Sequence, residues 1–281
     1  MDYDDFLRHI CPMLDLNWRK YRRRAARRGV QARIRELGLP GYAAYLDVLI
    51  ADSAEARALP DRMLVTVSRF FRERDRWRIL SERVLPVLAC EAQRAGPSGI
   101  GAGFPGKDAQ ALVKAWSVGA CGGEEPYTLS MVWLSWEAGG RQDAAVDILA
   151  TDIDPDSLER ARTADYQGSS LREVPSAARD RWFRQIGPDS WHVTEAARRP
   201  VRFWRHHLLD DLPPPASDLI LCRYLAFTYF IGDRRRRAVE RLAAASRPGG
   251  ALMVGAKEDP GGSLEGLFQP WPEAPGVYRR L

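Results

Sequence analysis

Two carboxylates follow a short run of small residues in the stretch WSVGACGGEEPYT, near the middle of the chain. Gly119, Cys121 and Gly123 form a G-x-C-x-G pattern, and small residues let a ligand approach the backbone of a turn between a strand and a helix. The helix N-terminus offers unpaired N–H groups, but Glu124 and Glu125 would repel a pyrophosphate. The pattern favours a cationic or neutral nucleoside ligand, although a tight turn can need the same glycines for steric reasons alone.

An aspartate stands at the end of the next apolar segment, in the stretch ILATDIDPDSLERAR. In open α/β sheets ligands lie at the carboxyl ends of the strands, and a carboxylate there can accept hydrogen bonds from both hydroxyls of a ribose. Asp152 occupies this place, although an aspartate after a strand is also a common cap of the following helix. Together with the glycine turn, Asp152 favours a nucleoside-binding site.

These carboxylates need a scaffold, which the second part of the chain predicts. Strands are expected at Val113–Val118, Val146–Thr151, Ser217–Cys222 and Ala251–Gly255, and helices at Glu125–Glu137, Pro155–Ala164 and Asp233–Ala245. Such alternation predicts an α/β fold with a parallel sheet covered by helices. The polar interval 166–200, with a Gly-Pro-Asp turn at 187–189, predicts a small inserted β-hairpin subdomain. In the tail, Leu267–Trp271 and Val277–Leu281 predict a closing antiparallel pair.

The amino-terminal part, residues 1–93, is predicted to be helical, because its apolar residues recur at intervals of three and four. Asp52 and Glu55 have the spacing of a capping box and would begin one of these helices. The stretch GPSGIGAGFPG that follows holds five glycines and two prolines in eleven residues. We therefore expect a helical domain over 1–93, a linker over 94–110 and a second domain over 111–281.

Composition restricts the class of protein. The 281 residues are 45% hydrophobic and 28% charged, which excludes a disordered, collagen-like or coiled-coil chain. The acidic start MDYDDFLRHI lacks the basic region of a secretory signal, and no window of about 18 residues is free of charge. We therefore expect a cytoplasmic protein without a membrane span. Four cysteines without a C-x-x-C spacing argue against disulfides and a zinc site, so no metal is expected.

The tract Arg19–Arg35, RKYRRRAARRGVQARIR, holds nine basic and no acidic residues in a chain of net charge +5. On a helix one apolar stripe would face inward and the arginines would cover the rest. The stripe consists of Ala26, Val30, Ile34 and Leu37. A solvated basic face is the simplest interpretation, and docking to an acidic helical protein is the next. An anionic small molecule or a nucleic acid is the third candidate ligand of this tract. Single-stranded nucleic acid is disfavoured, because Tyr21 is the only aromatic residue of the tract and bases need aromatic side chains to stack on.

Five motifs extend over most of the chain. They are SRFFRERDRWRIL at Ser68–Leu80, WSVGACGGEEPYT at Trp116–Thr128, ILATDIDPDSLERA at Ile148–Ala161, SDLILCRYLAFTYF at Ser217–Phe230 and PGGALMVGAKE at Pro248–Glu258. In this order they resemble the chemotaxis receptor methyltransferase (CheR) family. The resemblance implies a helical amino-terminal domain before a Rossmann-like class I S-adenosylmethionine-dependent methyltransferase domain. It also implies methyl esterification of glutamate side chains on receptors, with S-adenosylhomocysteine as the cofactor product.

The resemblance also implies roles for individual residues. The residues implied to contact the cofactor are Thr66, Ser68, Arg72, Val118, Gly119, Glu124, Asp152, His207, Leu208, Tyr224 and Leu225. Of these, His207 and Leu208 would lie beside the adenine. Catalytic roles are implied for Arg72 and Tyr229. Glu124 would receive the methionine ammonium of the cofactor, and Asp152 its ribose. An Arg72–Tyr229 pair would orient an acceptor carboxylate. No general base is required, because a glutamate with a pKa of about 4.3 is already ionised at neutral pH.

Three features depart from the family pattern. Tyr224 replaces the asparagine of a C-R-N motif, and His207 stands where an asparagine is usual beside the adenine. The chain is also one residue longer before Tyr229, so that Phe227 and Thr228 are alternatives for its place. These changes cluster on the substrate side. A protein glutamate is the first choice of acceptor, a small-molecule acid or other nucleophile the second, and a cofactor-binding module without turnover the third hypothesis.

Overall fold

The chain folds into two compact units. The computed structural model describes residues 1–96, 111–140 and 144–281. The first unit comprises Met1–Val67 and Tyr224–Val239, and the second comprises Ser68–Arg223 and Glu240–Leu281. The second unit thus begins at Ser68 and not after the expected linker 94–110, because the helices that follow Ser68 pack on its sheet. Residues 97–110 of that linker lie outside the described residues.

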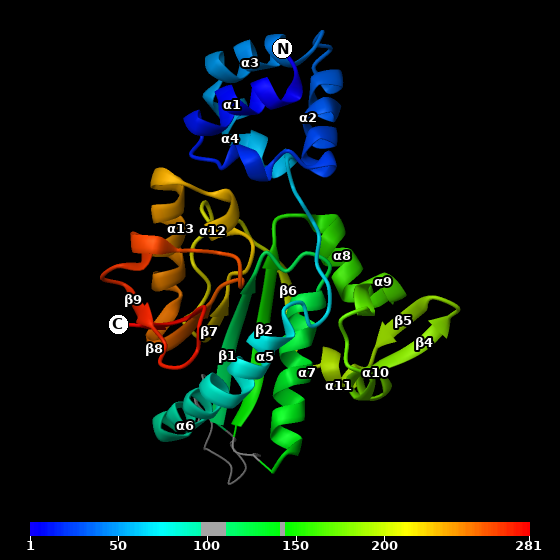
Figure 1. Cartoon of the computed structure of the whole chain (residues 1–281), viewed down its shortest axis with the longest axis vertical. Helices are drawn as coiled ribbons and strands as arrows, with labels where there is room; N and C mark the ends of the chain where they lie inside the picture. Colours follow the sequence, from blue (N-terminus) through cyan, green and yellow to red (C-terminus); the bar gives the residue numbers. More distant parts are fainter. Residues whose placement is uncertain (97–110, 141–143) are drawn as a thin grey trace, which may run out of the picture. The chain divides into compact units, whose positions relative to one another are not determined.

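Short helices build the first unit. They are α1 (Tyr3–Met13), the 3-10 helix η1 (Trp18–Lys20), α2 (Arg24–Glu36), α3 (Tyr42–Ala51), α4 (Ser53–Arg62), α12 (Ala226–Tyr229) and the first part of α13 (Gly232–Ala244) (Figure 1). Phe6 is fully buried, and its ring lies 5.6 and 5.9 Å from the ring centroids of Tyr42 and Tyr45. At Gly29 a Cβ atom would lie 1.7 Å from the carbonyl oxygen of Arg62, so glycine is what lets α2 approach α4 this closely.

Helix ends in the first unit agree in part with the sequence pattern. Asp52 caps α4 as expected, and its carboxylate accepts a hydrogen bond from the N–H of Glu55 at 3.2 Å. The side chain of Glu55 does not complete a capping box. It accepts hydrogen bonds from Arg33 and from the hydroxyl of Tyr45, each at 2.7 Å. Of the expected apolar stripe on α2 only Leu37 is exposed, because the helix ends one residue before it.

A seven-stranded sheet forms the centre of the second unit. Its strands, in spatial order, are β6 (Val201–Arg205), β2 (Ala144–Asp152), β1 (Ala111–Val118), β7 (Ser217–Leu221), β8 (Ser246–Met253), β10 (Val277–Arg280) and β9 (Phe268–Pro270). The strands from β6 to β8 are parallel, and β10 runs antiparallel to β8 and β9. The sheet confirms the expected α/β fold and the antiparallel pair of the tail. Because β6, β2, β1 and β7 are parallel, their carboxyl ends share one edge.

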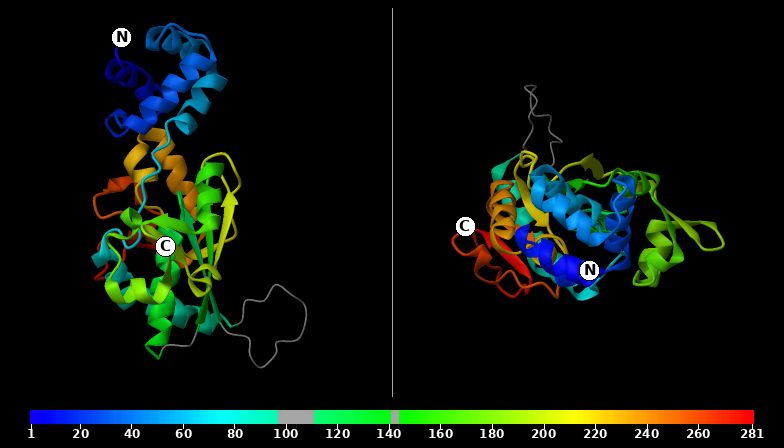
Figure 2. Two further views of the ribbon diagram at one scale, coloured as in Figure 1. Left: turned by 90° about the vertical axis from the view of Figure 1, so that its right-hand side faces the viewer. Right: turned by 90° about the horizontal axis from the view of Figure 1, so that it is seen from above.

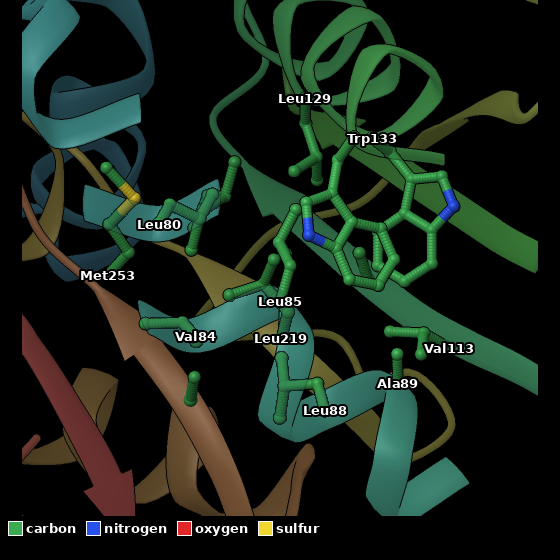
Figure 3. Packing of buried hydrophobic residues seen from close by; sticks show 14 of the residues in the cluster. Leu80, Val84, Leu85, Leu88, Ala89, Val113, Leu129, Trp133, Leu219 and Met253 are labelled. Carbon is green, nitrogen blue, oxygen red and sulfur yellow. The ribbon is translucent and has the colours of Figure 1, made fainter. Parts of the chain in front are cut away.

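Helices cover this sheet and bury its apolar residues. They are α5 (Arg74–Ile79), the π-helical segment η2 (Leu80–Val84), α6 (Leu85–Ala95), α7 (Glu124–Ala138), α8 (Pro155–Thr163) and the end of α13. Leu80, Leu85 and Leu88 belong to one buried cluster with Trp133 and Trp136 of α7 (Figure 3). The two tryptophans therefore pack in the hydrophobic core. None of the helices in the described ranges is long and apolar enough to cross a membrane.

A smaller antiparallel sheet is inserted before β6. It contains, in spatial order, β3 (Asp165–Gln167), β5 (Ser190–Val193) and β4 (Phe183–Gly187), accompanied by α9 (Gly168–Leu171), α10 (Ser176–Trp182) and α11 (Glu195–Arg198). The expected hairpin is present as β4 and β5, with β3 as an additional strand. In Figure 1 and in the right-hand view of Figure 2 this hairpin, in yellow-green, stands out from the main sheet. Phe70 packs edge-on against Tyr166 and Phe183 of this insert, at centroid distances of 4.7 and 4.9 Å.

Candidate functional site

The glycine turn between β1 and α7 has an unusual backbone. Gly119, Cys121 and Gly123 adopt positive φ angles of 71, 49 and 90°. At Gly123 a Cβ atom would lie 2.9 Å from the Cβ of Ala161, so a side chain there would collide with α8. The turn therefore needs Gly123 for steric reasons, and a role of these small residues in ligand binding stays a prediction.

Most N–H groups of this turn are used inside the protein. Those of Gly119 and Ala120 donate to the carbonyl oxygen of Thr151 at 2.8 and 2.9 Å, that of Cys121 donates to Asp152 at 2.8 Å, and that of Gly123 donates to the carbonyl oxygen of Ala120 at 2.9 Å. A phosphate-binding loop needs such groups to point at its ligand. The observed pattern agrees with the expectation that the ligand does not present a pyrophosphate to this turn.

Asp152 ends β2 and is buried, with 8% of its surface exposed. One carboxylate oxygen accepts from the N–H of Cys121, and the other accepts from the N–H of Asp154 at 3.0 Å. Each oxygen retains lone-pair capacity for a ligand hydroxyl. Burial raises the pKa of Asp152 against the opposing effect of these backbone hydrogen bonds. The interpretation of Asp152 as a helix cap is wrong, because Asp154 caps α8 through the N–H and hydroxyl of Ser157.

Glu124 is the first residue of α7 and is 5% exposed. Its Oε1 accepts a long hydrogen bond from the hydroxyl of Ser170 at 3.4 Å, whereas its buried Oε2 has no hydrogen-bond partner among the described residues. Burial raises the pKa of Glu124, although its own backbone N–H, the charge of Arg160 and the hydroxyls of Ser170 and Ser68 oppose this effect. A buried, unpartnered carboxylate oxygen is costly, and a cationic ligand group would relieve that cost. Glu124 and Asp152 thus fit the ammonium and ribose of S-adenosylmethionine.

The segment that carries Arg72 is hydrogen-bonded to α7 and to the inserted subdomain that contains β3, β4 and β5. The N–H of Phe70 donates to the carbonyl of Ser170 and the N–H of Phe71 donates to the hydroxyl of Thr128 on α7, both at 3.1 Å. Phe71 has a φ of 53° and Glu73 a φ of 64°, so Arg72 lies between two left-handed residues. Phe70 is fully buried, so this residue of the motif packs in the core.

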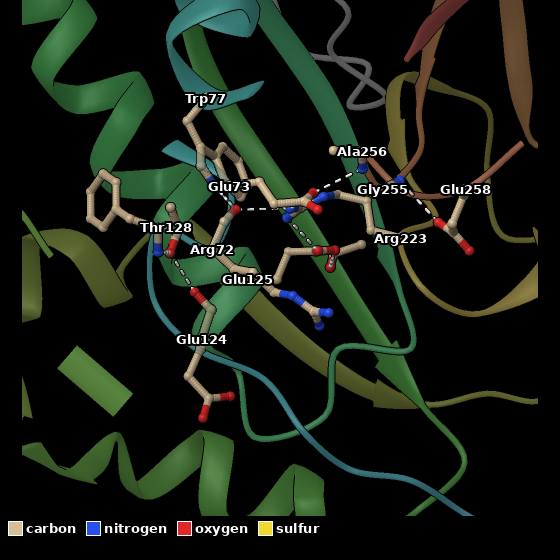
Figure 4. A network of polar contacts seen from close by, with 12 residues as sticks. Arg72, Glu73, Trp77, Glu124, Glu125, Thr128, Arg223, Gly255, Ala256 and Glu258 are labelled. Atoms are coloured by element: carbon tan, nitrogen blue, oxygen red, sulfur yellow. Dashed lines mark hydrogen bonds and ion pairs between the residues drawn. The ribbon is translucent and has the colours of Figure 1, made fainter. Parts of the chain in front are cut away.

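A buried ionic network adjoins Arg72 (Figure 4). The guanidinium of Arg223, which follows β7, donates to Glu125 at 3.0 Å and to Glu73 at 2.9 Å. Glu73 also accepts from the N–H of Ala256 at 3.0 Å, and Glu125 accepts from the hydroxyl of Ser117 at 3.0 Å. The sequence did not predict this network. The signal that could have indicated it is the position of charged residues, such as Arg223, directly after apolar segments that form strands.

The expected adenine residues follow β6. The N–H of His207 donates to Asp211 at 2.7 Å, and the ring Nδ1 of His207 lies 2.9 Å from the carboxylate of Asp210. Leu208 is buried, as is Val118 at the end of β1. His206, which the sequence analysis did not select, donates its N–H to the carbonyl oxygen of Asp152 at 3.0 Å. The second unit therefore brings this segment to the same sheet edge as the carboxylates.

Four expected site residues belong to the first unit. They are Thr66, Tyr224, Leu225 and Tyr229. The ring of Tyr229 packs on that of Tyr21 at 5.1 Å, and its carbonyl accepts from the N–H of Asn17 at 2.8 Å. Phe227 is 5% exposed, so this alternative to Tyr229 is a packing residue. The pairing of Tyr229 with Arg72 and the roles of the other three residues stay predictions.

The sequence of this chain matches known proteins. A family model described as "CheR methyltransferase, SAM binding domain" matches residues 66–272. The chain is 30% identical to a chemotaxis protein methyltransferase of Listeria monocytogenes, over 92% of this chain and 89% of that protein. It is 30% identical to a probable chemotaxis protein methyltransferase of Rhizobium etli, over 84% of each. It is also 29% identical to an uncharacterized 104.1 kDa protein of Rhodobacter capsulatus, over 87% of this chain and 24% of that protein. Because the family model and these relatives cover most of its length, the chain belongs to the CheR family of S-adenosylmethionine-dependent methyltransferases.

Proposed function

We propose that this protein transfers the methyl group of S-adenosylmethionine to the side-chain carboxylate of a protein glutamate and forms a methyl ester. Family membership supports methyl transfer, and the names of the Listeria and Rhizobium relatives support a chemotaxis protein as the acceptor. The observation that carries the cofactor assignment is the buried Oε2 of Glu124, which lacks a partner among the described side chains. That atom lies at the sheet edge where Asp152 also ends its strand.

The cofactor half of the site consists of groups that complement a cationic nucleoside. When bound, the cofactor supplies an electrophilic methyl group on a sulfonium. Glu124 binds the ammonium group of its methionine part, and Asp152 accepts hydrogen bonds from its ribose hydroxyls. Both carboxylates are buried, so each interaction acts in a medium of lower dielectric constant than water. The residues that follow β6, His207 and Leu208, contact the adenine.

In the acceptor half, Arg72 orients an ionised carboxylate. A guanidinium offers two parallel N–H donors that match the two oxygens of a carboxylate. Tyr229 is the residue that we propose to act on the transferring methyl group. No residue has to remove a proton, because the acceptor glutamate is ionised at neutral pH. Catalysis consists of alignment for an in-line displacement and of exclusion of water.

The basic face of α2 supports a protein acceptor. The exposed arginines of this helix are Arg24, Arg27, Arg28 and Arg35, and the exposed Arg22 and Arg23 directly precede it. Arg33 forms an ion pair with Glu55, and Arg22 forms one with Asp4, each at 2.7 Å. A cluster of exposed arginines on one helix complements an acidic surface and accelerates its association. We therefore propose an acidic helical protein as the partner of this face.

A small carboxylic acid is the second candidate acceptor, and the observation that favours it is Tyr224. This residue is half-buried and left-handed, with a φ of 58°, at a position that precedes α12. A phenol ring in place of a small amide would narrow the access of a helical acceptor.

A single labelling experiment separates these candidates. The protein is incubated with methyl-labelled S-adenosylmethionine and an extract of its host cells, and the label is sorted into macromolecular and small-molecule fractions. Each fraction is then treated with base, which releases methanol from carboxyl methyl esters. Base-labile label on protein is expected. Label in small molecules favours the second candidate, and binding of cofactor without any transfer identifies a module without turnover.

A further inference from the structure

We infer that Arg223 is a positioning residue for Arg72. It holds the backbone of the segment 71–73 and thereby sets the place of the Arg72 guanidinium. The inference rests on the proposed function, in which Arg72 orients the acceptor carboxylate. The contact that carries it is a hydrogen bond from Nη2 of Arg223 to the backbone carbonyl oxygen of Arg72, at 2.9 Å (Figure 4).

The segment around Arg72 needs external support. Phe71 and Glu73 both occupy the left-handed region, which residues other than glycine, asparagine and aspartate rarely adopt. Such a backbone persists only where surrounding contacts impose it. The carbonyl group of Arg72 lies between these two residues and receives two donors, Nη2 of Arg223 and Nε1 of Trp77 at 3.0 Å. The two donors come from different elements, so they hold this point of the backbone from two directions.

The environment of Arg223 makes its side chain rigid. Only 2% of the side chain is exposed, and its guanidinium lies 5.1 Å from the centroid of the Trp77 ring. One Nη atom donates to Glu125 on α7, and the other donates both to Glu73 and to the Arg72 carbonyl. The planar guanidinium of arginine donates hydrogen bonds to acceptors in several fixed directions. A lysine would keep the charge but has one nitrogen on a flexible stem, and it would not reproduce this set of contacts.

The network also joins the two halves of the proposed site. Glu125, which binds Arg223, directly follows Glu124, the residue proposed for the cofactor ammonium. Glu73, its other acidic partner, directly follows Arg72. Arg223 therefore connects the first turn of α7 with the acceptor-binding segment. Positions of reacting groups matter at this scale, because a displacement of about 1 Å can lower a rate by on the order of a hundredfold.

Two substitutions test the inference. Arg223→Lys removes the planar guanidinium. Trp77→Phe removes the Nε1 donor and part of the buried indole, and it keeps a smaller aromatic ring beside the guanidinium. We expect each to lower kcat by roughly tenfold to a hundredfold and to leave the dissociation constant of S-adenosylhomocysteine within about threefold of the parent value. The matched control is Arg247→Lys, which changes the ion pair of Arg247 with Asp218 of β7 at 2.9 Å. The control should alter thermal stability but not kcat.

Hydrogen exchange supplies a measurement that does not depend on turnover. In Arg223→Lys the peptide that covers residues 69–74 should exchange faster, whereas a peptide from β7 that contains Asp218 should not. Should Arg223→Lys fail to fold, Glu125→Gln decides the question by the same two measurements, because it weakens the ion pair that holds Arg223 and leaves residues 69–74 unchanged. Unchanged exchange of residues 69–74, or unchanged kcat in an active parent background, overturns the inference. If the parent transfers no methyl group to any acceptor, the proposed function fails, and the exchange result still decides whether Arg223 holds this segment.

Discussion

The carboxylate of Asp152 accepts a hydrogen bond from the backbone N–H of Cys121 at 2.8 Å. Cys121 is left-handed, with a φ of 49°, in the turn that leads from β1 into α7. Asp152 therefore ties the end of one strand to the turn after its neighbour, and it also faces the sheet edge where ligands of such folds lie. A substitution at Asp152 would act both on the turn and on the proposed ribose contact, and two variants separate these effects.

Asp152→Asn keeps an acceptor oxygen for the N–H of Cys121 and removes the charge, whereas Asp152→Ala removes both. We expect the asparagine variant to bind S-adenosylhomocysteine about tenfold more weakly, because a hydrogen bond to a charged group contributes about 1.5–3 kcal/mol. The alanine variant should bind more weakly still and unfold at a lower temperature. Titration calorimetry and thermal unfolding measure the two effects. Unchanged affinity of Asp152→Asn would remove the ribose role.

The affinity for the cofactor should depend on pH through Glu124. Burial raises the pKa of this carboxyl group, and only its ionised form attracts an ammonium group. Affinity should therefore fall as the pH decreases through this raised pKa, and binding in that range should release a proton. Calorimetry in buffers of different ionisation enthalpy measures the proton.

Glu124→Gln provides the comparison for this pH dependence. The variant should bind more weakly at neutral pH and show a shallower dependence, which is then due to Asp152, whose pKa burial also raises. A pH profile of Glu124→Gln as steep as that of the parent would contradict the role of Glu124.

The strands and helices could be predicted because each leaves a local pattern, and the positions of Glu124 and Asp152 at their ends follow from the same pattern. The spacing of apolar residues and the residue composition predict the strand before Gly119 and the helix after it. A carboxylate at the end of a strand is recognised from its position in the sequence alone. The apolar stripe on α2 was predictable for the same reason. The prediction was wrong only at Leu37, because the helix ends at Glu36.

Features that depend on tertiary contacts were not predictable. The assignment of residues 74–95 to the unit that contains the sheet depends on which apolar surface Leu80 and Leu85 bury against, and helix periodicity does not specify this surface. The left-handed backbone of Phe71 and Glu73 opposes local preference, so only the finished fold imposes it. The network of Arg223 joins segments that are distant in sequence, and charged residue types alone did not identify which of them meet.

Arg72→Lys tests the acceptor-binding role of this residue. The substitution keeps the positive charge but replaces a planar fork by a single ammonium group, which loses bidentate contact with a carboxylate. We expect kcat/KM for the acceptor to fall by roughly tenfold or more, with an unfolding temperature close to that of the parent. Steady-state kinetics with the acceptor found by methyl labelling measures this change. Normal turnover in Arg72→Lys would make Arg72 a structural residue.

Acid should destabilise the first unit through Glu55. Hydrogen bonds from Arg33 lower the pKa of Glu55 to about 2, from a value of 4.5 in the unfolded chain. A carboxyl group with a lowered pKa contributes stability that is fully present above pH 4.5 and is lost as the pH falls toward 2. Glu55→Gln should therefore lower the free energy of unfolding by at most about 3 kcal/mol at neutral pH. The difference from the parent should shrink below pH 4.5, as chemical denaturation at several pH values would reveal, and a constant difference would contradict this origin.

Tyr224→Asn should stabilise the protein relative to Tyr224→Ala. The φ of Tyr224 is 58°, in a region where asparagine is tolerated and alanine and tyrosine are disfavoured. Both substitutions remove the phenol ring, so the comparison between them isolates the backbone preference from the loss of ring contacts. We expect the asparagine variant to exceed the alanine variant by about 1 kcal/mol in free energy of unfolding, because a left-handed conformation costs other residues about 1–2 kcal/mol. Equal stability of the two variants would mean that the backbone relaxes at this position. If the ring also selects the acceptor, both variants should gain activity toward glutamate peptides relative to small carboxylic acids, since either one opens the same space.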